Sequence, residues 1–220
     1  MIELLLIRHG ETDWNTVRRL QGHIDIPLND TGLNQARLLG AALQNEHLDA
    51  VLCSDLQRAV QTAQAIATLK NLPCQISDQW RERSFGGFEG QLINTLEQRF
   101  PVEYAAWRAY ETDSQFPYNA DSGHHGETIR QFHARIEAAL IALCQTYPDQ
   151  KVAVVAHGGV LECVYRISRQ LPLNAPREVS LLNASINRFE VRLHENQLDI
   201  RLVQFGDIAH LSTALDEIGL

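Results

Sequence analysis

Two histidines each follow a short apolar run and precede a glycine. His9 comes after the run at 3–7, with Arg8 directly before it, and His157 comes after the run at 152–156. An imidazole can transfer protons, and it can also attack an electrophile as a nucleophile. A neighbouring guanidinium binds phosphate oxygens through a planar fork of N–H donors. These residue types therefore indicate chemistry on a phosphoryl group.

A second arginine falls where a helix terminus can help to hold an anion. Arg58 lies in the first turn of a helix predicted after the apolar run at 50–53, and Ser54 is the predicted cap of that helix. Backbone N–H groups and the helix dipole favour negative charge at such a terminus. Asn15, six residues after His9, is a neutral donor to the same anion. We therefore expect these side chains to share one site.

Together these residues supply what phosphoryl transfer requires, which is an in-line nucleophile, donors to the equatorial oxygens and a proton for the leaving group. We predict that His9 is the nucleophile. The arginine charges disfavour an imidazolium, which lowers the pKa of His9 and keeps its attacking nitrogen unprotonated near neutral pH. A phosphohistidine would form and water would then hydrolyse it, so that one difficult step becomes two easier ones.

The leaving group also needs an acid, and Glu82 is the predicted donor. It lies in a loop after a short strand predicted near 74–77. A carboxyl group beside phosphate anions has a raised pKa, so it can hold the proton that it delivers. Glu89, seven residues later, is the rival candidate for this role.

Strand-like runs alternate with helical periodicity along the chain. The three apolar runs are continuous rather than alternating, which is typical of strands buried on both faces. Helical periodicity marks the segments 33–43, 59–66, 136–143 and 160–169. Strands separated by helices predict an α/β fold with a mostly parallel sheet covered on both faces. The segments 186–193 and 198–205 flank a polar turn at Glu195 and Asn196, which predicts an antiparallel edge hairpin.

The stretch at about 85–127 interrupts this alternation with two prolines, several aromatic residues and a polar loop at 111–126. We interpret it as a cap region inserted over one end of the sheet, within a single domain at 1–220. Ligands of open α/β sheets bind outside the carboxyl ends of the strands. Arg8, His9 and His157 are predicted to lie at such ends, so the fold can bring them together.

The composition excludes several classes of partner. The chain has 220 residues, with 19 basic and 27 acidic side chains and a formal charge of −8, which does not suit a nucleic-acid partner. The apolar run at 2–7 is too short to span a membrane and no leader-like pattern follows it, so we expect no membrane partner and a cytoplasmic location. The four cysteines have no paired metal-binding spacing, and we expect no metal site.

Six segments resemble, in order, the motifs of the histidine phosphatase superfamily, phosphoglycerate mutase-like branch. They lie at 6–15, 21–32, 54–62, 81–90, 126–128 and 156–159. The resemblance extends from Ile2 to about Phe189. It implies a three-layer α/β/α sandwich and catalysis without metal or cofactor. It implies His9 as the phosphorylated residue, Glu82 as the acid/base, and Arg8, Arg58 and His157 as phosphate ligands. The expected substrate-binding residues are Arg8, Asn15, Gln21, Gly22, Arg58, Glu82, His157 and Gly158.

The same resemblance includes two activities. Cofactor-dependent phosphoglycerate mutases bind a bisphosphate with lysines and paired arginines of their inserted region, whereas this insertion has no lysine and no adjacent arginine pair. Its charged residues include the acidic Glu97, Glu103, Glu111, Asp113 and Asp121 and the basic Arg99 and Arg108. An acidic cap disfavours a doubly phosphorylated ligand. We therefore predict a phosphatase for a small phosphorylated metabolite, with the mutase as the alternative and a non-enzymatic binding module as a third hypothesis. A homodimer and the identity of the metabolite are left open.

Overall fold

The computed structural model describes residues 1–195 and 197–216. A six-stranded sheet has the order β3-β2-β4-β1-β5-β6. The strands are β1 (Ile2–Arg8), β2 (Ala50–Cys53), β3 (Cys74–Ile76), β4 (Lys151–Ala156), β5 (Ile186–His194) and β6 (Gln197–Asp207). β1, β2, β3 and β4 are parallel, while β5 pairs antiparallel with β1 and with β6. The mostly parallel α/β sheet and its antiparallel edge hairpin are therefore confirmed, although Asn196 of the predicted turn lies outside the described residues.

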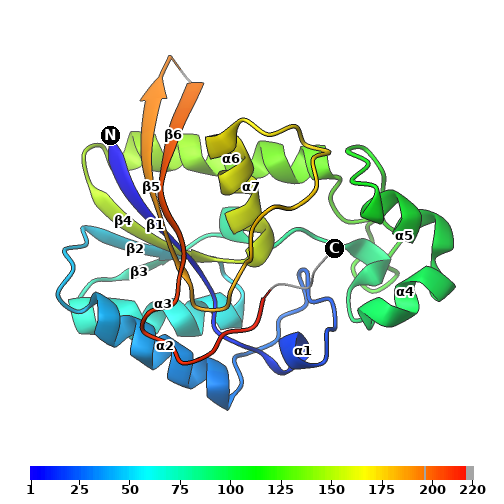
Figure 1. Ribbon diagram of the computed structural model, residues 1–220, viewed down its shortest axis with the longest axis horizontal. Helices are drawn as coiled ribbons and strands as arrows, with labels where there is room; N and C mark the ends of the chain where they lie inside the picture. The colour runs from blue at the N-terminus through cyan, green and yellow to red at the C-terminus, as the bar shows by residue number, and fades with distance from the viewer. Residues whose placement is uncertain (196, 217–220) are drawn as a thin grey trace.

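Helices cover both faces of the sheet, which confirms the three-layer sandwich (Figure 1). The helices are α1 (Asp13–Thr16), α2 (Asp30–Leu43), α3 (Gln57–Lys70), α4 (Ile93–Arg99), α5 (Pro101–Arg108), α6 (Ile129–Thr146) and α7 (Gly158–Arg169). Along β1, Leu4 and Leu6 pack with α6 and α7, whereas Leu5 and Ile7 pack with α2 and α3. Because successive strand residues point to opposite faces, a strand between two helical layers must be apolar at every position.

The start of α3 corrects one prediction. The helix begins at Gln57, after an extended Leu56, and Ser54 does not cap it. The Ser54 hydroxyl instead accepts a hydrogen bond from the Leu56 N–H at 3.3 Å. The acceptor at this terminus comes from another loop, because Asp25 Oδ1 accepts from the Gln57 N–H at 2.7 Å. A carboxylate from a distant loop therefore does what the local sequence assigned to serine.

The region at 85–127 forms one 3₁₀ turn and two short α-helices around a small core. A 3₁₀ turn at Gly86–Phe88 precedes α4 and α5, which lie beside the sandwich rather than over a face of the sheet (Figure 1). Five side chains make up its buried cluster: Leu20, Phe88, Leu96, Trp107 and Phe116. Edge-to-face aromatic contacts hold this cluster together, including Phe88 with Trp107 at 5.7 Å between ring centroids.

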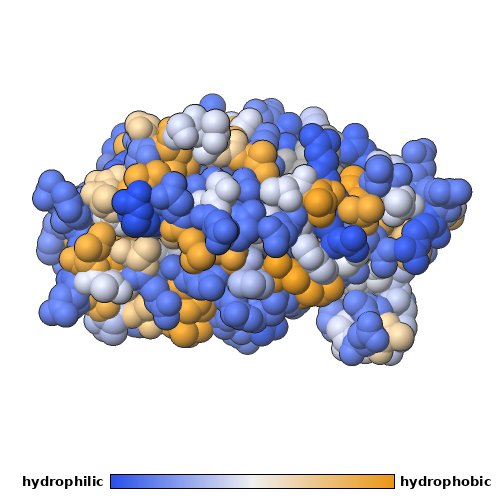
Figure 2. All heavy atoms as spheres, turned by 90° about the horizontal axis from the view of Figure 1, so that it is seen from below, coloured by the Kyte–Doolittle hydropathy of each residue, from blue (hydrophilic) through white to orange (hydrophobic). Residues whose placement is uncertain are grey.

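The surface shows no large continuous hydrophobic area on the face seen from below. Hydrophobic residues there form several small groups among hydrophilic ones (Figure 2). In residues 1–195 and 197–216, no helix has both the length and the apolar character that crossing a bilayer requires.

Candidate active site

His9 and His157 lie side by side at the carboxyl ends of two neighbouring strands. β1 ends at Arg8 and β4 ends at Ala156, and these two residues pair in the parallel register. The next residue of each strand is therefore a histidine. The two imidazole centroids are 5.1 Å apart in an edge-on arrangement, and both side chains are buried. Strand register thus brings together the two histidines that the sequence predicted.

Arg8 and Arg58 are buried beside these imidazoles and are held by backbone carbonyls. Arg8 is the last residue of β1, and Arg58 lies in the first turn of α3, as predicted. The acceptors are the carbonyl oxygens of Leu181 and Leu215 (3.3 Å) for Arg8, and those of Gly22 (2.8 Å) and Ile24 (2.9 Å) for Arg58. Carbonyl acceptors orient a guanidinium without cancelling its charge. Arg58 also holds the loop that contains Gly22.

Burial and the arginine charges keep both histidines neutral. Burial lowers the pKa of His9 well below its usual value, and the charges of Arg58 and Arg8 lower that pKa further. Burial and then the charge of Arg58 likewise lower the pKa of His157. His9 Nδ1 lies 2.7 Å from the Gly10 carbonyl oxygen, which can only accept, so Nδ1 carries the proton. Nε2 of His9 therefore holds the lone pair that a nucleophile needs.

The two neutral histidines predict a pH-dependent stability. Their pKa values are lower in the folded protein than in the unfolded chain, where a histidine titrates near about 6.5. The unfolded state then binds more protons, so the free energy of unfolding falls as the pH decreases through about 6.5, by at most ~1.4 kcal/mol per pH unit and group. Between about pH 7.5 and 5.5, we expect His157→Asn to lose less stability than the wild type.

Urea unfolding of both proteins at the two pH values measures this difference. The remaining ionisable groups are the same in both proteins, so their contributions cancel. Glu46, whose ion pairs with Arg188 and Lys151 lower its pKa to about 2, stays charged throughout this range. Equal losses of stability in the two proteins would show that His157 is not buried as a neutral group.

Glu82 faces the same cavity as His9, and both of its carboxylate oxygens are held by backbone donors. Oε1 accepts from the N–H of Arg83 at 2.7 Å, and Oε2 accepts from the N–H of Gly159 at 2.9 Å. Gly159 lies in the first turn of α7, directly after His157 and Gly158. The carboxylate is therefore oriented by the same helix start that positions His157.

Arg135 of α6 holds the loop that carries Glu82. Its guanidinium donates to the carbonyl oxygens of Gln79 at 2.9 Å, Arg81 at 3.0 Å and Glu82 at 3.1 Å. It also forms a two-pronged ion pair with Glu127, with both N···O distances 2.7 Å. Sequence reasoning missed Arg135, because one arginine in an amphipathic helix has no distinguishing pattern; the motif at 126–128 was the only indirect signal.

Glu89, the rival acid, is used to hold backbone instead. Its Oε1 accepts from the Ser84 hydroxyl at 3.0 Å and from the N–H groups of Phe85 at 2.8 Å and His23 at 3.2 Å. It is not among the residues that line the cavity, whereas Glu82 is. A Cβ at Gly22, whose φ is +53°, would stand 2.2 Å from this same oxygen. Glu89 therefore fixes the loop at 21–23 against the turn at 84–89.

Of the remaining residues predicted to contact the substrate, some line the cavity and others do not. Gln21 and Gly22 line the cavity, whereas Asn15 and Gly158 are not among its lining residues. The amide oxygen of Asn15 accepts from the N–H and the hydroxyl of Thr12, each at 3.0 Å, in the capping box of α1. Asn15 thus stabilises the loop after β1 from within. At the start of α7, the lining residue is the second glycine rather than the first.

Gly159 provides a test of how tightly the acid is positioned. A Cβ at this position would lie 2.2 Å from Glu82 Oε1, so Gly159→Ala must displace the carboxylate. Alanine favours a helix over glycine, so the fold is kept. We expect kcat/KM to fall about 10²-fold while the melting temperature changes by less than ~4 °C. Steady-state kinetics beside thermal unfolding check this, and unchanged kinetics would mean that Glu82 takes no part.

The cavity wall contains four further arginines that sequence reasoning did not single out. They are Arg19, Arg83, Arg166 and Arg177. None of the acidic residues named for the insertion lines this cavity, and neither do Arg99 and Arg108. The charged residues named for the insertion therefore do not contact a ligand in this cavity. The insertion contributes apolar walls instead, through Phe85, Trp107 and Tyr110.

Comparisons with known proteins agree with this geometry. Residues 4–203 match the model of the histidine phosphatase superfamily (branch 1). Phosphoglycerate mutase-like protein 4 of Arabidopsis thaliana is 34% identical over 212 residues, which are 95% of this chain and 86% of that protein. Bacillus stearothermophilus YhfR is 26% identical with a TM-score of 0.81, over 96% of this chain and 99% of that one. A mycobacterial glucosyl-3-phosphoglycerate phosphatase, solved with VO3, is 26% identical with a TM-score of 0.78, over 93% and 98%.

The chain therefore belongs to the histidine phosphatase superfamily. The likeness covers the sheet, both helical layers and the insertion, because nearly the whole of each chain is superposed. The family resemblance and the fold class predicted from the sequence are both confirmed.

Proposed function

We propose that the protein is a metal-independent phosphatase that hydrolyses a small phosphomonoester metabolite through a phosphohistidine at His9. The observation that carries this proposal is the buried pair of neutral imidazoles beside Arg8 and Arg58. The two guanidinium groups would bind the oxygens of a phosphoryl group. His9 Nε2 would then lie in position for in-line attack on phosphorus. His157 has no hydrogen-bond partner for its ring nitrogens among the described residues, which suits a donor to a phosphoryl oxygen.

In the first step, the lone pair of His9 Nε2 forms a bond to phosphorus and the bond from phosphorus to the ester oxygen breaks. Glu82 gives its proton to the departing oxygen, so the alcohol leaves neutral. In the second step, the Glu82 carboxylate takes a proton from water, whose oxygen bonds to phosphorus while the N–P bond breaks. Inorganic phosphate leaves, and His9 and Glu82 return to their starting protonation states.

The charges of the cavity support hydrolysis over the mutase alternative. A mutase must hold two phosphates at once, which requires a second strongly cationic subsite. Arg166 is paired with Glu162 at 2.7 Å, and Arg177 is paired with Asp216 at 3.5 Å. Two of the four further arginines thus already face carboxylates. The Arabidopsis relative is a phosphoglycerate mutase-like protein, which favours the alternative, so a mutase reaction is the second candidate.

A phosphatase screen over phosphorylated metabolites in EDTA tests the proposal. We expect phosphate release from at least one small phosphomonoester of the panel, at an unchanged rate when the chelator is present. With 3-phosphoglycerate, phosphate release should exceed isomerisation to 2-phosphoglycerate. Faster isomerisation would establish the mutase, and loss of turnover in EDTA would refute the metal-independent mechanism.

A further inference from the structure

Arg83 differs from the other three arginines named for the cavity wall in how its positive charge is compensated. Arg166 is neutralised by Glu162 and Arg177 is paired with Asp216, while Arg19 is only half-buried and reached by water. Arg83 is 9% exposed and lines the same cavity as His9. It is therefore the buried cation of this wall that a ligand could compensate.

The guanidinium of Arg83 has few polar contacts for a buried group. Its Nε donates to the carbonyl oxygen of Glu127 at 2.9 Å, and its central carbon lies 4.7 Å above the ring of Phe116. In the described part of the chain, no carboxylate oxygen lies within 4.0 Å of its nitrogens. Burial lowers the pKa of Arg83 to about 10, although the more distant charge of Glu127 opposes this. An anion placed against Arg83 would remove this desolvation penalty.

Another part of this wall is apolar and largely aromatic. The side chains concerned come from the insertion, from α6 and from the loop after α7: Phe85, Trp107, Ile129, Phe132 and Leu173. Such a surface gains free energy by burying a hydrocarbon or ring face, and it offers little to a polyhydroxylated sugar. The alcohol part of the substrate should therefore be apolar between its phosphate and its second charged group.

The charge next to Arg83 selects the kind of anion. Glu82, Glu127 and Glu162 all act on Arg83 electrostatically, so its neighbourhood is already rich in carboxylates. A phosphate dianion would meet this repulsion twice over, whereas a carboxylate matches the single charge of one guanidinium. A carboxylate also fits the planar fork of N–H donors in a bidentate manner.

We infer that the substrate is the phosphate ester of an apolar, preferably aromatic, alcohol that bears one carboxylate, and that Arg83 binds this carboxylate. This inference rests on the proposed phosphatase function. Arg83 would then determine specificity, because its contact is made to the leaving group and not to the phosphoryl group. The apolar part of the wall would bind the ring that lies between the phosphoryl group and the carboxylate.

A matched pair of substrates tests the inference. 4-(Carboxymethyl)phenyl phosphate carries the acid, and 4-(carbamoylmethyl)phenyl phosphate is its neutral isostere with a similar leaving group. The wild type should prefer the acid by about tenfold in kcat/KM, and Arg83→Gln should remove most of this preference. Arg108→Gln removes the same formal charge from an exposed position outside the cavity and should leave the ratio unchanged.

A binding measurement separates this inference from the proposed function. The phosphonate analogues of both compounds cannot be hydrolysed, and calorimetry should show the same preference for the acid in the wild type and its loss in Arg83→Gln. Hydrolysis through His9 with no preference for the acid would overturn the inference and leave the phosphatase function standing. Preferential binding of the acid without hydrolysis would support the role of Arg83 and overturn the phosphatase function. Faster hydrolysis of 4-(phosphonomethyl)phenyl phosphate than of the carboxylate substrate would also overturn the inference. Equal effects of Arg83→Gln and Arg108→Gln on the preference would overturn it as well.

Discussion

His9→Ala will abolish turnover, lowering kcat by at least about 10⁴-fold for every phosphomonoester that the wild type hydrolyses. The reason is that no other described side chain combines a lone pair, burial beside Arg8 and Arg58, and a place at the end of β1. His157 stays in place but has the role of a donor. Binding residues alone then provide only the residual catalysis that positioning gives.

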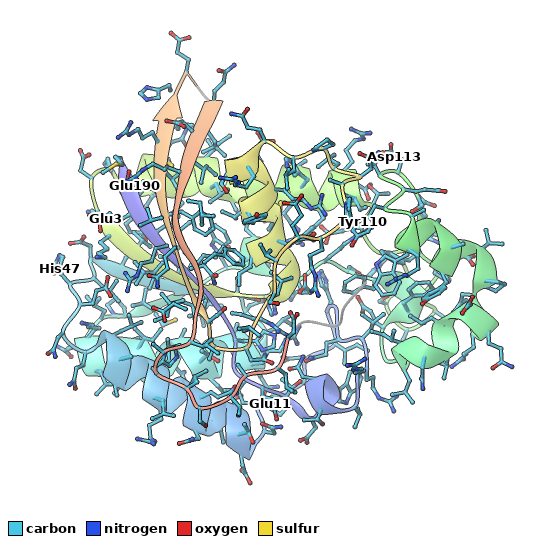
Figure 3. The ribbon with its side chains drawn as sticks, viewed as in Figure 1. Glu3, Glu11, His47, Tyr110, Asp113 and Glu190 are labelled. Atoms are coloured by element: carbon cyan, nitrogen blue, oxygen red, sulfur yellow. The ribbon has the colours of Figure 1, made fainter. Side chains whose placement is uncertain are left out.

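Rapid alkaline quenching with labelled substrate measures the intermediate directly. The wild type should carry label that is stable to alkali and labile to acid, as expected of a phosphohistidine, and His9→Ala should carry none. His47→Ala is the matched control, because His47 is exposed and lies at the opposite end of the molecule from Tyr110 of the cavity (Figure 3). Label that persists in His9→Ala would mean that another residue is the nucleophile.

The same two arginines explain both binding and activation. A guanidinium attracts a phosphoryl dianion and at the same time disfavours an imidazolium beside it. Burial lowers the pKa of His9 most, and the arginines of the anion site lower it further. Once the phosphoryl group is bound, its negative charge offsets part of the arginine effect, and burial then keeps the imidazole neutral before attack.

The sandwich and the two histidines could be predicted because they depend on local patterns. A strand between two helical layers is apolar at every position, so the run ending at Arg8 is visible in the sequence as a buried strand. Parallel strands then bring their carboxyl ends to one edge, which places His9 near His157 without any knowledge of the intervening chain. Spacing and periodicity suffice for such features.

The cavity wall could not be predicted, because it depends on contacts between distant segments. Asp25 replaces Ser54 at the start of α3 through a loop-to-helix contact. Arg83 is buried where the insertion packs the ring of Phe116 against its guanidinium. Burial and pairing, rather than residue type, decide whether an arginine acts on a ligand. Composition alone therefore could not tell which charged residues line the cavity.

Glu82→Gln will slow reactions in proportion to how much the leaving group needs a proton. For an alkyl phosphate, kcat/KM should fall about 10³-fold, because the alkoxide can no longer be protonated as it leaves. For 4-nitrophenyl phosphate, whose phenolate leaves without a proton, kcat/KM should fall by less than about tenfold. Hydrolysis of the phosphohistidine needs the same carboxylate as a base, so kcat should fall with both substrates.

Pre-steady-state kinetics with 4-nitrophenyl phosphate makes the second consequence visible. Glu82→Gln should release a burst of nitrophenolate equal to the enzyme concentration and accumulate the phosphoenzyme. Glu89→Gln is the matched control, since Glu89 holds backbone outside the cavity and glutamine keeps its accepting oxygen. That variant should keep the wild-type ratio between the two substrates. The assignment of the acid to Glu82 would be refuted by the opposite pattern, in which Glu89→Gln shows the leaving-group dependence and Glu82→Gln does not.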